Sequence, residues 1–232
     1  MAKNVKITAS LMCTNIRFIE RDIKILEKEG IDWLHFDIMD GTFVPNFGLS
    51  ITQMAELRIL TKLPFDVHMM AVEPIRFVEK LVEAGADIIT VHAEACKNLK
   101  ETIAKIKSYN KKVGVALNPM TPFSLISKHL DSIDVILFMC TNPGFTSQKF
   151  IPEVVKKIGD FTKVIKEKNL KIDIAVDGGI NPSTVPALAR AGANVFVGGT
   201  TGLFHSNSTY KESIERLREA AKSNIIETSV AK

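Results

Sequence analysis

The feature that most constrains the fold is an alternation of two kinds of segment along the whole chain. Short runs of β-branched and apolar residues are each followed by a longer stretch with apolar residues at helical spacing. Such alternation is typical of a parallel sheet covered by helices. Repetition of the unit without a second composition class favours a closed (β/α)8 barrel over an open doubly wound sheet. The predicted strands are Lys6–Ala9, Trp33–Asp37, Phe65–Met69, Ile88–His92, Val113–Leu117, Val135–Met139, Ile172–Asp177 and Val195–Val197.

The stretches between these strands predict amphipathic helices, and the weakest helical patterns follow Gly48 and Thr121. No stretch of linker composition divides the 232 residues, so we expect one barrel domain over residues 1–232, with residues 224–232 as a frayed polar tail. The predicted helices are Ile16–Glu29, Pro74–Ala84, Leu99–Ser108, Pro152–Lys168, Pro182–Ala191 and Tyr210–Ala221.

Composition excludes several classes of protein. A hydrophobic content of 46% and a charged content of 24% exclude a disordered chain. The net charge of +4 comes from lysines spread along the sequence, so we expect no nucleic-acid partner. No apolar run has the length of a membrane span or a signal core, which predicts no membrane partner and a cytoplasmic location. Three cysteines without CxxC spacing predict free thiols.

Histidines and aspartates gather at the predicted C-terminal ends of strands, where parallel barrels carry their functional residues. Period-two alternation places His35 and Asp37 on one face of the second strand, and His68 lies one strand over. Asp177 ends the seventh strand and is able to complete the set from across the barrel. Imidazole and carboxylate groups suit zinc, iron, cobalt and manganese. Either histidine alone is more readily a buried core residue, but the four side chains together favour a metal site.

The two aspartates also suggest acid/base chemistry. If Asp37 and Asp177 face each other across the barrel mouth, one can remove a proton from carbon while the other holds a proton on the opposite face. A metal on a neighbouring carbonyl oxygen stabilises the enediolate that forms. The alternative, in which both aspartates are only ligands or only structural, remains open at this point.

The remaining histidines predict no site: we expect His92 to be structural and His129 and His205 to lie at the surface. On the third strand the same alternation places Asp66 on the face of His68. Three methionines fall near the proposed mouth, at Met39, Met70 and Met139. Methionine commonly fills gaps in a core, and three at strand ends can also form a dry lining over a reacting carbon.

Two glycine-rich loops stand where barrels bind phosphate. Gly178-Gly179-Ile180-Asn181-Pro182 leads from the seventh strand into a helix, and Gly198-Gly199-Thr200-Thr201-Gly202 follows the eighth strand. The loop from Asn142 to Gln148 follows the sixth strand and is either a lid over a substrate or a plain connection.

Several stretches of the sequence are similar to one known family, the ribulose-phosphate 3-epimerases. They occur in the family's order from residue 10 to about residue 204, and the HxDxMDGxFVPN stretch from His35 to Asn46 is the most specific. The resemblance implies a TIM barrel of the ribulose-phosphate-binding type and an isomerase that epimerises carbon 3 of a phosphorylated ketose. The other matching stretches are Ser10-Leu11-Met12-Cys13, Asp66-Val67-His68-Met69-Met70, Gly85-Ala86-Asp87, Asn142-Pro143-Gly144-Phe145, Val176-Asp177-Gly178-Gly179-Ile180-Asn181 and Gly198-Gly199-Thr200.

The resemblance also implies a cofactor, an oligomer and residue roles. It implies one divalent metal ion per subunit (Zn, Mn, Fe or Co), held by His35, Asp37, His68 and Asp177. It implies that Asp37 and Asp177 are the acid/base pair, and that the chain forms a homo-oligomer, a dimer or a hexamer. The substrate-binding residues that it implies are Ser10, His68, Met39, Met70, Met139, Gly144, Phe145, Thr146, Ser147, Gly178, Gly179, Gly199, Thr200 and Thr201.

The sequence departs from the family pattern in ways that bear on the substrate. The family's Gly-Phe-Gly-Gly loop here reads Gly144-Phe145-Thr146-Ser147, so the freedom of two glycines is lost. Ala9 replaces a proline. The Ser-Leu-Met-Cys opening, Leu49-Ser50 and Thr201-Gly202-Leu203-Phe204 are more similar to the branch that acts on D-allulose 6-phosphate. The intact Asp-Gly-Gly-Ile-Asn stretch is more similar to the branch that acts on D-ribulose 5-phosphate.

These features lead us to expect conversion of D-allulose 6-phosphate to D-fructose 6-phosphate, with D-ribulose 5-phosphate to D-xylulose 5-phosphate as the alternative. Two other classes compete. A metal-free phosphate-binding barrel, such as a decarboxylase, needs a lysine at a strand end, and the predicted strand ends offer none. A non-catalytic phosphosugar-binding barrel has no need of the two histidines and two aspartates that this chain keeps.

Overall fold

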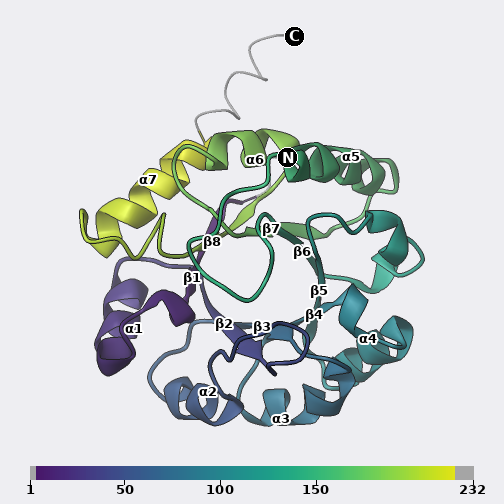
Figure 1. The fold of residues 1–232 in the computed structure, drawn as a ribbon, viewed down its shortest axis with the longest axis horizontal. Coiled ribbons are helices and arrows are strands. Elements are labelled where there is room, and N and C mark those ends of the chain that lie inside the picture. The colour runs from purple at the N-terminus through teal and green to yellow at the C-terminus, as the bar shows by residue number, and fades with distance from the viewer. Residues whose placement is uncertain (1–3, 223–232) are drawn as a thin grey trace.

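The fold is a closed barrel of parallel strands, seen along its axis in Figure 1. The structure is a computed structural model and describes residues 4–222. Within these residues eight strands pair in sequence order, and the last pairs with the first. This confirms the predicted (β/α)8 TIM barrel. The strands are β1 Lys6–Ser10, β2 Trp33–Met39, β3 Phe65–Met70, β4 Ile88–His92, β5 Lys112–Leu117, β6 Val135–Met139, β7 Asp173–Asp177 and β8 Val195–Gly198.

Helices form a ring around the strands (Figure 1). The predicted helices at Ile16 and Pro74 each begin with a 3-10 turn, Ile16–Phe18 and Pro74–Phe77, before the α-helix starts. After β5 the chain forms two 3-10 helices, Phe123–Ile126 and Leu130–Ser132, where no α-helix is found. Prolines at 119 and 122 supply no N–H to a helix there. The α-helices are α1 Ile19–Lys28, α2 Ile51–Arg58, α3 Val78–Glu83, α4 Leu99–Ser108, α5 Glu153–Glu167, α6 Val185–Ala191 and α7 Tyr210–Lys222.

Side-chain alternation along the strands separates two cores. Residues such as Leu34 and Phe36 point outward and are buried with the apolar faces of the helices. Residues of the other parity point into the barrel, so the interior is packed rather than open. The apolar residues of this inner core are Trp33, Ile88, Ala116, Val135, Leu137, Met139, Ala175, Val195 and Val197.

The N-terminal end of the barrel is closed by a repeated hydrogen bond. Immediately before β2, β4, β6 and β8 stands an Asp or Asn whose side chain accepts the N–H of a residue on the preceding strand. These bonds fix the lower ends of neighbouring strands in register, opposite the end where the predicted site lies. The pairs are Asp32 with Ile7, Asp87 with Phe65, Asp134 with Val113 and Asn194 with Ile174, at 2.8–2.9 Å.

Over residues 4–222 we find no helix with both the length and the apolar character that crossing a bilayer requires. The predicted frayed tail, residues 224–232, lies outside the described residues.

Candidate metal centre and active site

Four side chains meet at the C-terminal end of the barrel. The register of β2 and β3 pairs Asp37 with His68, and the alternation turns both inward. Oδ1 of Asp37 lies 3.4 Å from Nε2 of His35 and 3.2 Å from Nδ1 of His68. From β7, Oδ2 of Asp177 lies 3.9 Å from the same nitrogen of His68. The structure therefore brings together the whole predicted set, with one ligand atom of each residue within 4.8 Å of the others.

The geometry of this cluster fits a divalent metal ion. Ligand bonds of about 2.0–2.2 Å in a tetrahedral site place neighbouring ligand atoms roughly 3.3–3.6 Å apart, which is close to the two Asp37 distances. Nε2 of His35 is buried and has no hydrogen-bond partner among the described residues. A buried imidazole nitrogen that makes no hydrogen bond and faces the carboxylate of Asp37 at 3.4 Å is the arrangement expected of a metal ligand.

The two carboxyl groups differ in their affinity for a proton. Burial alone raises the pKa of each, but the charges and hydrogen bonds of His35 and His68 hold the pKa of Asp37 well below its usual range. The pKa of Asp177 is raised, by burial and by the negative charge of Asp37. A pair of carboxyl groups whose pKa values are pushed apart is the pattern of an acid and its partner base.

Each histidine of the cluster is held from behind by a buried group. Nδ1 of His35 lies 2.8 Å from Oδ2 of Asp66, whose other oxygen accepts the hydroxyl of Thr90 at 3.0 Å. Burial alone lowers the pKa of His35, but the carboxylates of Asp37 and Asp66 on its two sides raise it well above its usual value. Nε2 of His68 lies 2.8 Å from Nε2 of His92. We expected His92 to be structural, and no role was predicted for Asp66, although alternation placed it on the correct face.

Ser10 joins the site from the end of β1. Its hydroxyl donates to Oδ2 of Asp37 at 2.7 Å, so the Asp37 carboxylate is oriented from two sides, by this hydroxyl and by His68. Cys13 lies beside Ser10, and burial raises the pKa of its thiol to about 11. A thiol held in its neutral form is a weak nucleophile, so Cys13 lines the site but does not act as a nucleophile there.

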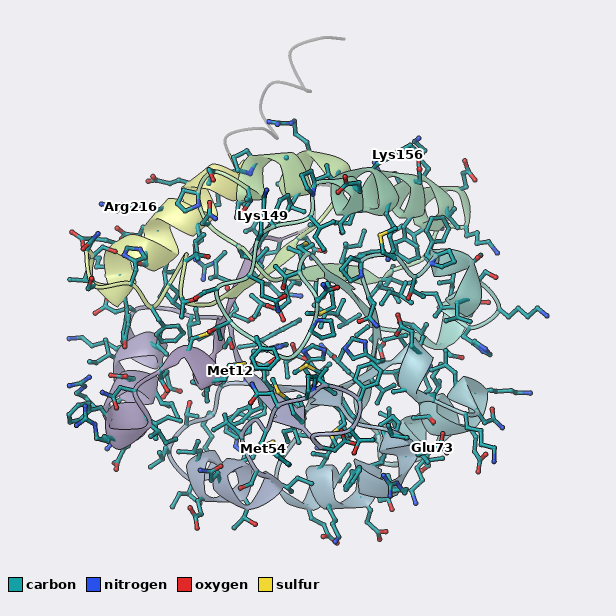
Figure 2. The ribbon with its side chains drawn as sticks, in the orientation of Figure 1. Met12, Met54, Glu73, Lys149, Lys156 and Arg216 are labelled. Atoms are coloured by element: carbon teal, nitrogen blue, oxygen red, sulfur yellow. The ribbon has the colours of Figure 1, made fainter. Side chains whose placement is uncertain are left out.

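The three predicted methionines line the cavity above the cluster. Met39 and Met70 pack together with Val44 and the partly buried Met12, and Met139 lies beside them at the end of β6. Met12 sits over the barrel mouth, whereas Lys156 and Arg216 lie on the outer helices (Figure 2). Met12 was not predicted, because it lies on a short 3-10 turn after β1 and not on a strand.

Backbone loops form the opposite wall of the cavity. The predicted glycine-rich loops contribute Gly178, Gly179, Gly199, Thr200 and Thr201, and the loop after β6 contributes residues 142–148. In Figure 1 this loop crosses the mouth of the barrel. It is tied down at two points: Asn46 Nδ2 donates to Gly144 O at 2.7 Å, and the hydroxyls of Ser147 and Thr200 lie 3.3 Å apart. Phe145 is half exposed at the tip.

The other two histidines lie away from the cluster. His129 is half-buried, just before the 3-10 helix Leu130–Ser132, and the half-buried His205 contacts Ser208 and Ser213 near the start of α7. Glu94 is a group that sequence reasoning missed. Its Oε2 lies 3.4 Å from Nδ1 of His92, and although burial alone raises its pKa, contacts with His92, Thr121 and Asn118 lower that pKa to about 2.

Comparison with known proteins identifies the family. The sequence model of the ribulose-phosphate 3-epimerase family matches residues 6–204, which is most of the chain. The chain belongs to this family. It is 41% identical over 215 residues to the ribulose-phosphate 3-epimerase of Bacillus subtilis, covering 92% of this chain and 98% of that protein. It is 40% identical over 217 residues to the ribulose-phosphate 3-epimerase of Methanocaldococcus jannaschii, covering 94% and 91%.

Solved structures extend the likeness of fold. The 3-keto-L-gulonate-6-phosphate decarboxylase of Vibrio cholerae superposes with a TM-score of 0.65 at 16% identity, covering 95% of this chain and 99% of that one. The 3-hexulose-6-phosphate synthase of Salmonella typhimurium gives a TM-score of 0.64 at 17% identity, covering 94% and 99%. At such identity these neighbours show the shared barrel and nothing of its chemistry.

Membership of the ribulose-phosphate 3-epimerase family confirms the predicted enzyme class, an isomerase acting on carbohydrate phosphates. It argues against a metal-free decarboxylase. The expected preference for D-allulose 6-phosphate is not supported, because the curated relatives carry the ribulose-phosphate name and the alternative substrate fits better. That expectation rested on short stretches at the end of β1, before α2 and after β8, whereas the comparison spans most of the chain.

Proposed function

We propose that this chain interconverts D-ribulose 5-phosphate and D-xylulose 5-phosphate by moving a proton at carbon 3. The observation that carries the proposal is the placement of Asp37 and Asp177 on β2 and β7, in one buried cluster at the floor of the cavity. Two carboxyl groups so placed can address opposite faces of one carbon. The names of the curated relatives support the choice of a five-carbon substrate.

In the proposed reaction one aspartate removes the carbon-3 proton and the other returns a proton to the opposite face. The substrate passes through an enediolate, and the configuration at carbon 3 is inverted. His35, Asp37, His68 and Asp177 would hold a divalent ion (Zn, Mn, Fe or Co), which when bound supplies Lewis-acid stabilisation of the charge on the substrate oxygens. The hydroxyl of Ser10 keeps the Asp37 carboxylate aimed at the cavity.

The remaining cavity residues bind and enclose the sugar phosphate. Met39, Met70 and Met139 cover the reacting carbon with apolar surface, which excludes water that would otherwise protonate the intermediate. We assign the phosphate to the backbone N–H groups of two loops, after β7 and after β8, as barrels commonly arrange. The phosphate residues are Gly178, Gly179, Gly199, Thr200 and Thr201, and the covering loop is Gly144, Phe145, Thr146 and Ser147.

Proton exchange at carbon 3 tests this proposal directly. Metal-loaded protein is added to D-ribulose 5-phosphate and, separately, to D-allulose 6-phosphate in deuterium oxide, and both are followed by NMR. We expect deuterium at carbon 3 with formation of D-xylulose 5-phosphate, and a larger kcat/KM for the five-carbon sugar. A larger kcat/KM for D-allulose 6-phosphate overturns the choice of substrate. Binding of either sugar without exchange would make the chain a non-catalytic phosphosugar-binding barrel.

Assembly and location follow as parts of the same proposal. We propose a homo-oligomer, a dimer or a hexamer, acting in the cytoplasm. Light scattering on the purified chain distinguishes the two assemblies, and a monomer under those conditions contradicts this part of the proposal without touching the chemistry.

A further inference from the structure

His92 is a buried histidine that the proposed reaction leaves without a task. It ends β4 and has no exposed surface. Its ring meets that of His68 edge to edge, with centroids 5.0 Å apart and 27° between the ring planes, and the ring of Phe43 lies 4.7 Å from it between centroids. Its two nitrogens face different groups: Nε2 lies 2.8 Å from Nε2 of His68, and Nδ1 lies 3.4 Å from Oε2 of Glu94. His92 therefore stands between a metal-cluster histidine and a carboxylate.

The short contact between the two rings couples their hydrogen positions. Two nitrogens 2.8 Å apart share one hydrogen, so one ring donates and the other accepts. Nδ1 of His68 is the nitrogen that points into the cluster, 3.2 Å from Asp37. To act as a ligand it must carry no hydrogen, so a neutral His68 carries its hydrogen on Nε2. His92 must then accept at Nε2 and carry its own hydrogen on Nδ1.

A carboxylate stands at each end of this pair of rings. Asp37 favours a hydrogen on Nδ1 of His68, because a bare nitrogen facing a carboxylate is repelled by it. Glu94 favours a hydrogen on Nδ1 of His92 for the same reason. The contact of 3.4 Å is longer than a usual hydrogen bond, so Glu94 acts chiefly through its charge. The two preferences oppose each other, since only the arrangement that Glu94 favours leaves Nδ1 of His68 free to bind a metal.

Glu94 is anchored where it stands. Its other oxygen, Oε1, accepts the backbone N–H of Asn118 at 2.8 Å, and Lys157 donates to the carbonyl of Asn118 at 2.8 Å. Only a fifth of the Glu94 side chain is exposed. The carboxylate is thus fixed to the segment after β5, and its charge acts on His92 from a constant position.

We propose that His92 and Glu94 are positioning residues that set His68 in the tautomer able to bind the metal. The inference rests on the metal site of the proposed function. It also gives both cluster histidines the same kind of support: Asp66 reaches His35 directly, and Glu94 reaches His68 through His92.

Nitrogen NMR of histidine-labelled protein reads the tautomers directly. The sequence has five histidines, and loss of one pair of signals in His92→Phe assigns those of His92. In zinc-loaded protein we expect a hydrogen on Nδ1 of His92 and on Nε2 of His68. In metal-free protein we expect Glu94→Gln to lower the fraction of His92 that carries its hydrogen on Nδ1, because the neutral amide attracts that hydrogen less.

Metal affinity gives the second measurement. Co²⁺ is titrated into each protein against a competing chelator, and the dissociation constant is read from the visible absorption of the bound ion. Loss of a group behind a metal ligand typically weakens binding about 10–100-fold. We expect His92→Phe to fall within that range and Glu94→Gln near its lower end. His92→Gln, whose amide oxygen can still accept from Nε2 of His68, should recover part of the affinity lost in His92→Phe.

Glu73→Gln is the matched control. Oε1 of Glu73 accepts the backbone N–H of Lys97 at 2.6 Å, a loop-to-loop bond like that of Glu94, but Glu73 lies toward the outer edge of the molecule (Figure 2). We expect it to bind Co²⁺ as the wild type does. Thermal melting checks that each variant is folded.

The outcomes separate this inference from the proposed function. A bare Nδ1 on His92 in the zinc-loaded protein overturns the inference, as does wild-type Co²⁺ affinity in folded Glu94→Gln and His92→Phe. Failure of the wild type to bind either ion overturns the metal site itself. In that event, a comparison of the His92 tautomer in the metal-free wild type and in metal-free Glu94→Gln still shows whether Glu94 controls the hydrogen position on His92.

Discussion

The carboxylate of Asp66 lies 2.8 Å from Nδ1 of His35, so Nε2 of the same ring is the nitrogen left to face the metal cluster. This contact fixes both the orientation of the imidazole and the position of its hydrogen. Since a carboxylate only accepts, Asp66 keeps a hydrogen on Nδ1, and in the metal-binding form of the ring the lone pair is on Nε2.

Asp66→Asn should therefore weaken metal binding more than it weakens the fold. The new amide can donate to Nδ1, which moves the hydrogen of His35 to Nε2 and blocks the ligand position. We expect Co²⁺ affinity to fall about 10–100-fold, the range for groups behind metal ligands. Asp22→Asn, which changes a buried carboxylate on α1 paired with Arg21, is the control. Equal affinities in the two variants would contradict the role of Asp66.

The proposed acid/base pair predicts a specific pattern of proton exchange in its variants, in addition to a loss of activity. Asp37→Asn and Asp177→Asn should each lower kcat/KM for epimerisation by about 10²–10⁴-fold, the range for a general acid or base. Each variant keeps one working carboxylate, which still removes and returns a proton on its own face. We expect carbon-3 deuterium exchange without inversion, from one epimer in Asp37→Asn and from the other in Asp177→Asn.

Metal content by mass spectrometry separates chemistry from ligand loss in these two variants. Exchange from both epimers in either metal-loaded variant would show that a third group can supply the missing proton, and the two-aspartate mechanism would be wrong.

Period-two alternation was sufficient to predict which strand residues share the inner face. It placed His35 with Asp37 and Asp66 with His68 before any register was known, because a strand's faces depend only on its own sequence. The register that sets Asp37 beside His68 depends on the pairing of β2 with β3, which no local pattern encodes.

Residues on short turns were not predictable in the same way. Glu94 lies on a 3-10 helix, Ala93–Ala95, where there is no long period from which to read a direction. Met12 lies on a similar turn after β1. The substrate expectation was drawn from such loop residues, and it is also the expectation that the comparisons do not support.

A glycine in the loop after β7 gives a test of stability with a matched comparison. Gly178 has a φ of +98°, and a Cβ there would stand within 2.2 Å of the Thr141 hydroxyl oxygen. We expect Gly178→Ala to lower the free energy of unfolding by about 1–3 kcal/mol. Gly159 lies within α5 with no neighbouring atom within 4 Å of its would-be Cβ, so Gly159→Ala should stabilise by about 0.5–1 kcal/mol. Urea denaturation measures both, and a change of the same sign in the two variants would contradict the argument.

Glu94 should make stability depend on pH in the acid range. Its pKa in the folded chain is about 2, below its usual value of 4.5, so the unfolded chain binds more protons between these values. The stabilisation is present above about pH 4.5 and is lost as the pH falls toward 2, an effect of roughly 1–3 kcal/mol in total. Glu94→Gln should therefore lose less stability than the wild type between pH 5 and pH 3 in urea titrations. An equally steep loss in both proteins would contradict this assignment.

Asn194 departs from the pattern at the N-terminal end of the barrel, where three aspartates precede β2, β4 and β6. Its amide oxygen accepts the N–H of Ile174 at 2.8 Å, and its amide nitrogen donates to Oδ1 of Asp173 at 2.8 Å. An aspartate at this position would place a second carboxylate against Asp173, so only the amide satisfies both neighbours.

Asn194→Ala leaves the buried N–H of Ile174 without a partner and should cost about 1–3 kcal/mol of unfolding free energy, measured in urea. Asn194→Asp keeps the acceptor but adds the repulsion, which neutralisation removes, so its deficit should shrink as the pH falls toward 4. Asn207→Ala, at an exposed position, should stay within about 0.5 kcal/mol of the wild type. A deficit in Asn194→Asp that does not change with pH would mean that lost geometry, and not charge, explains why this strand end carries an amide.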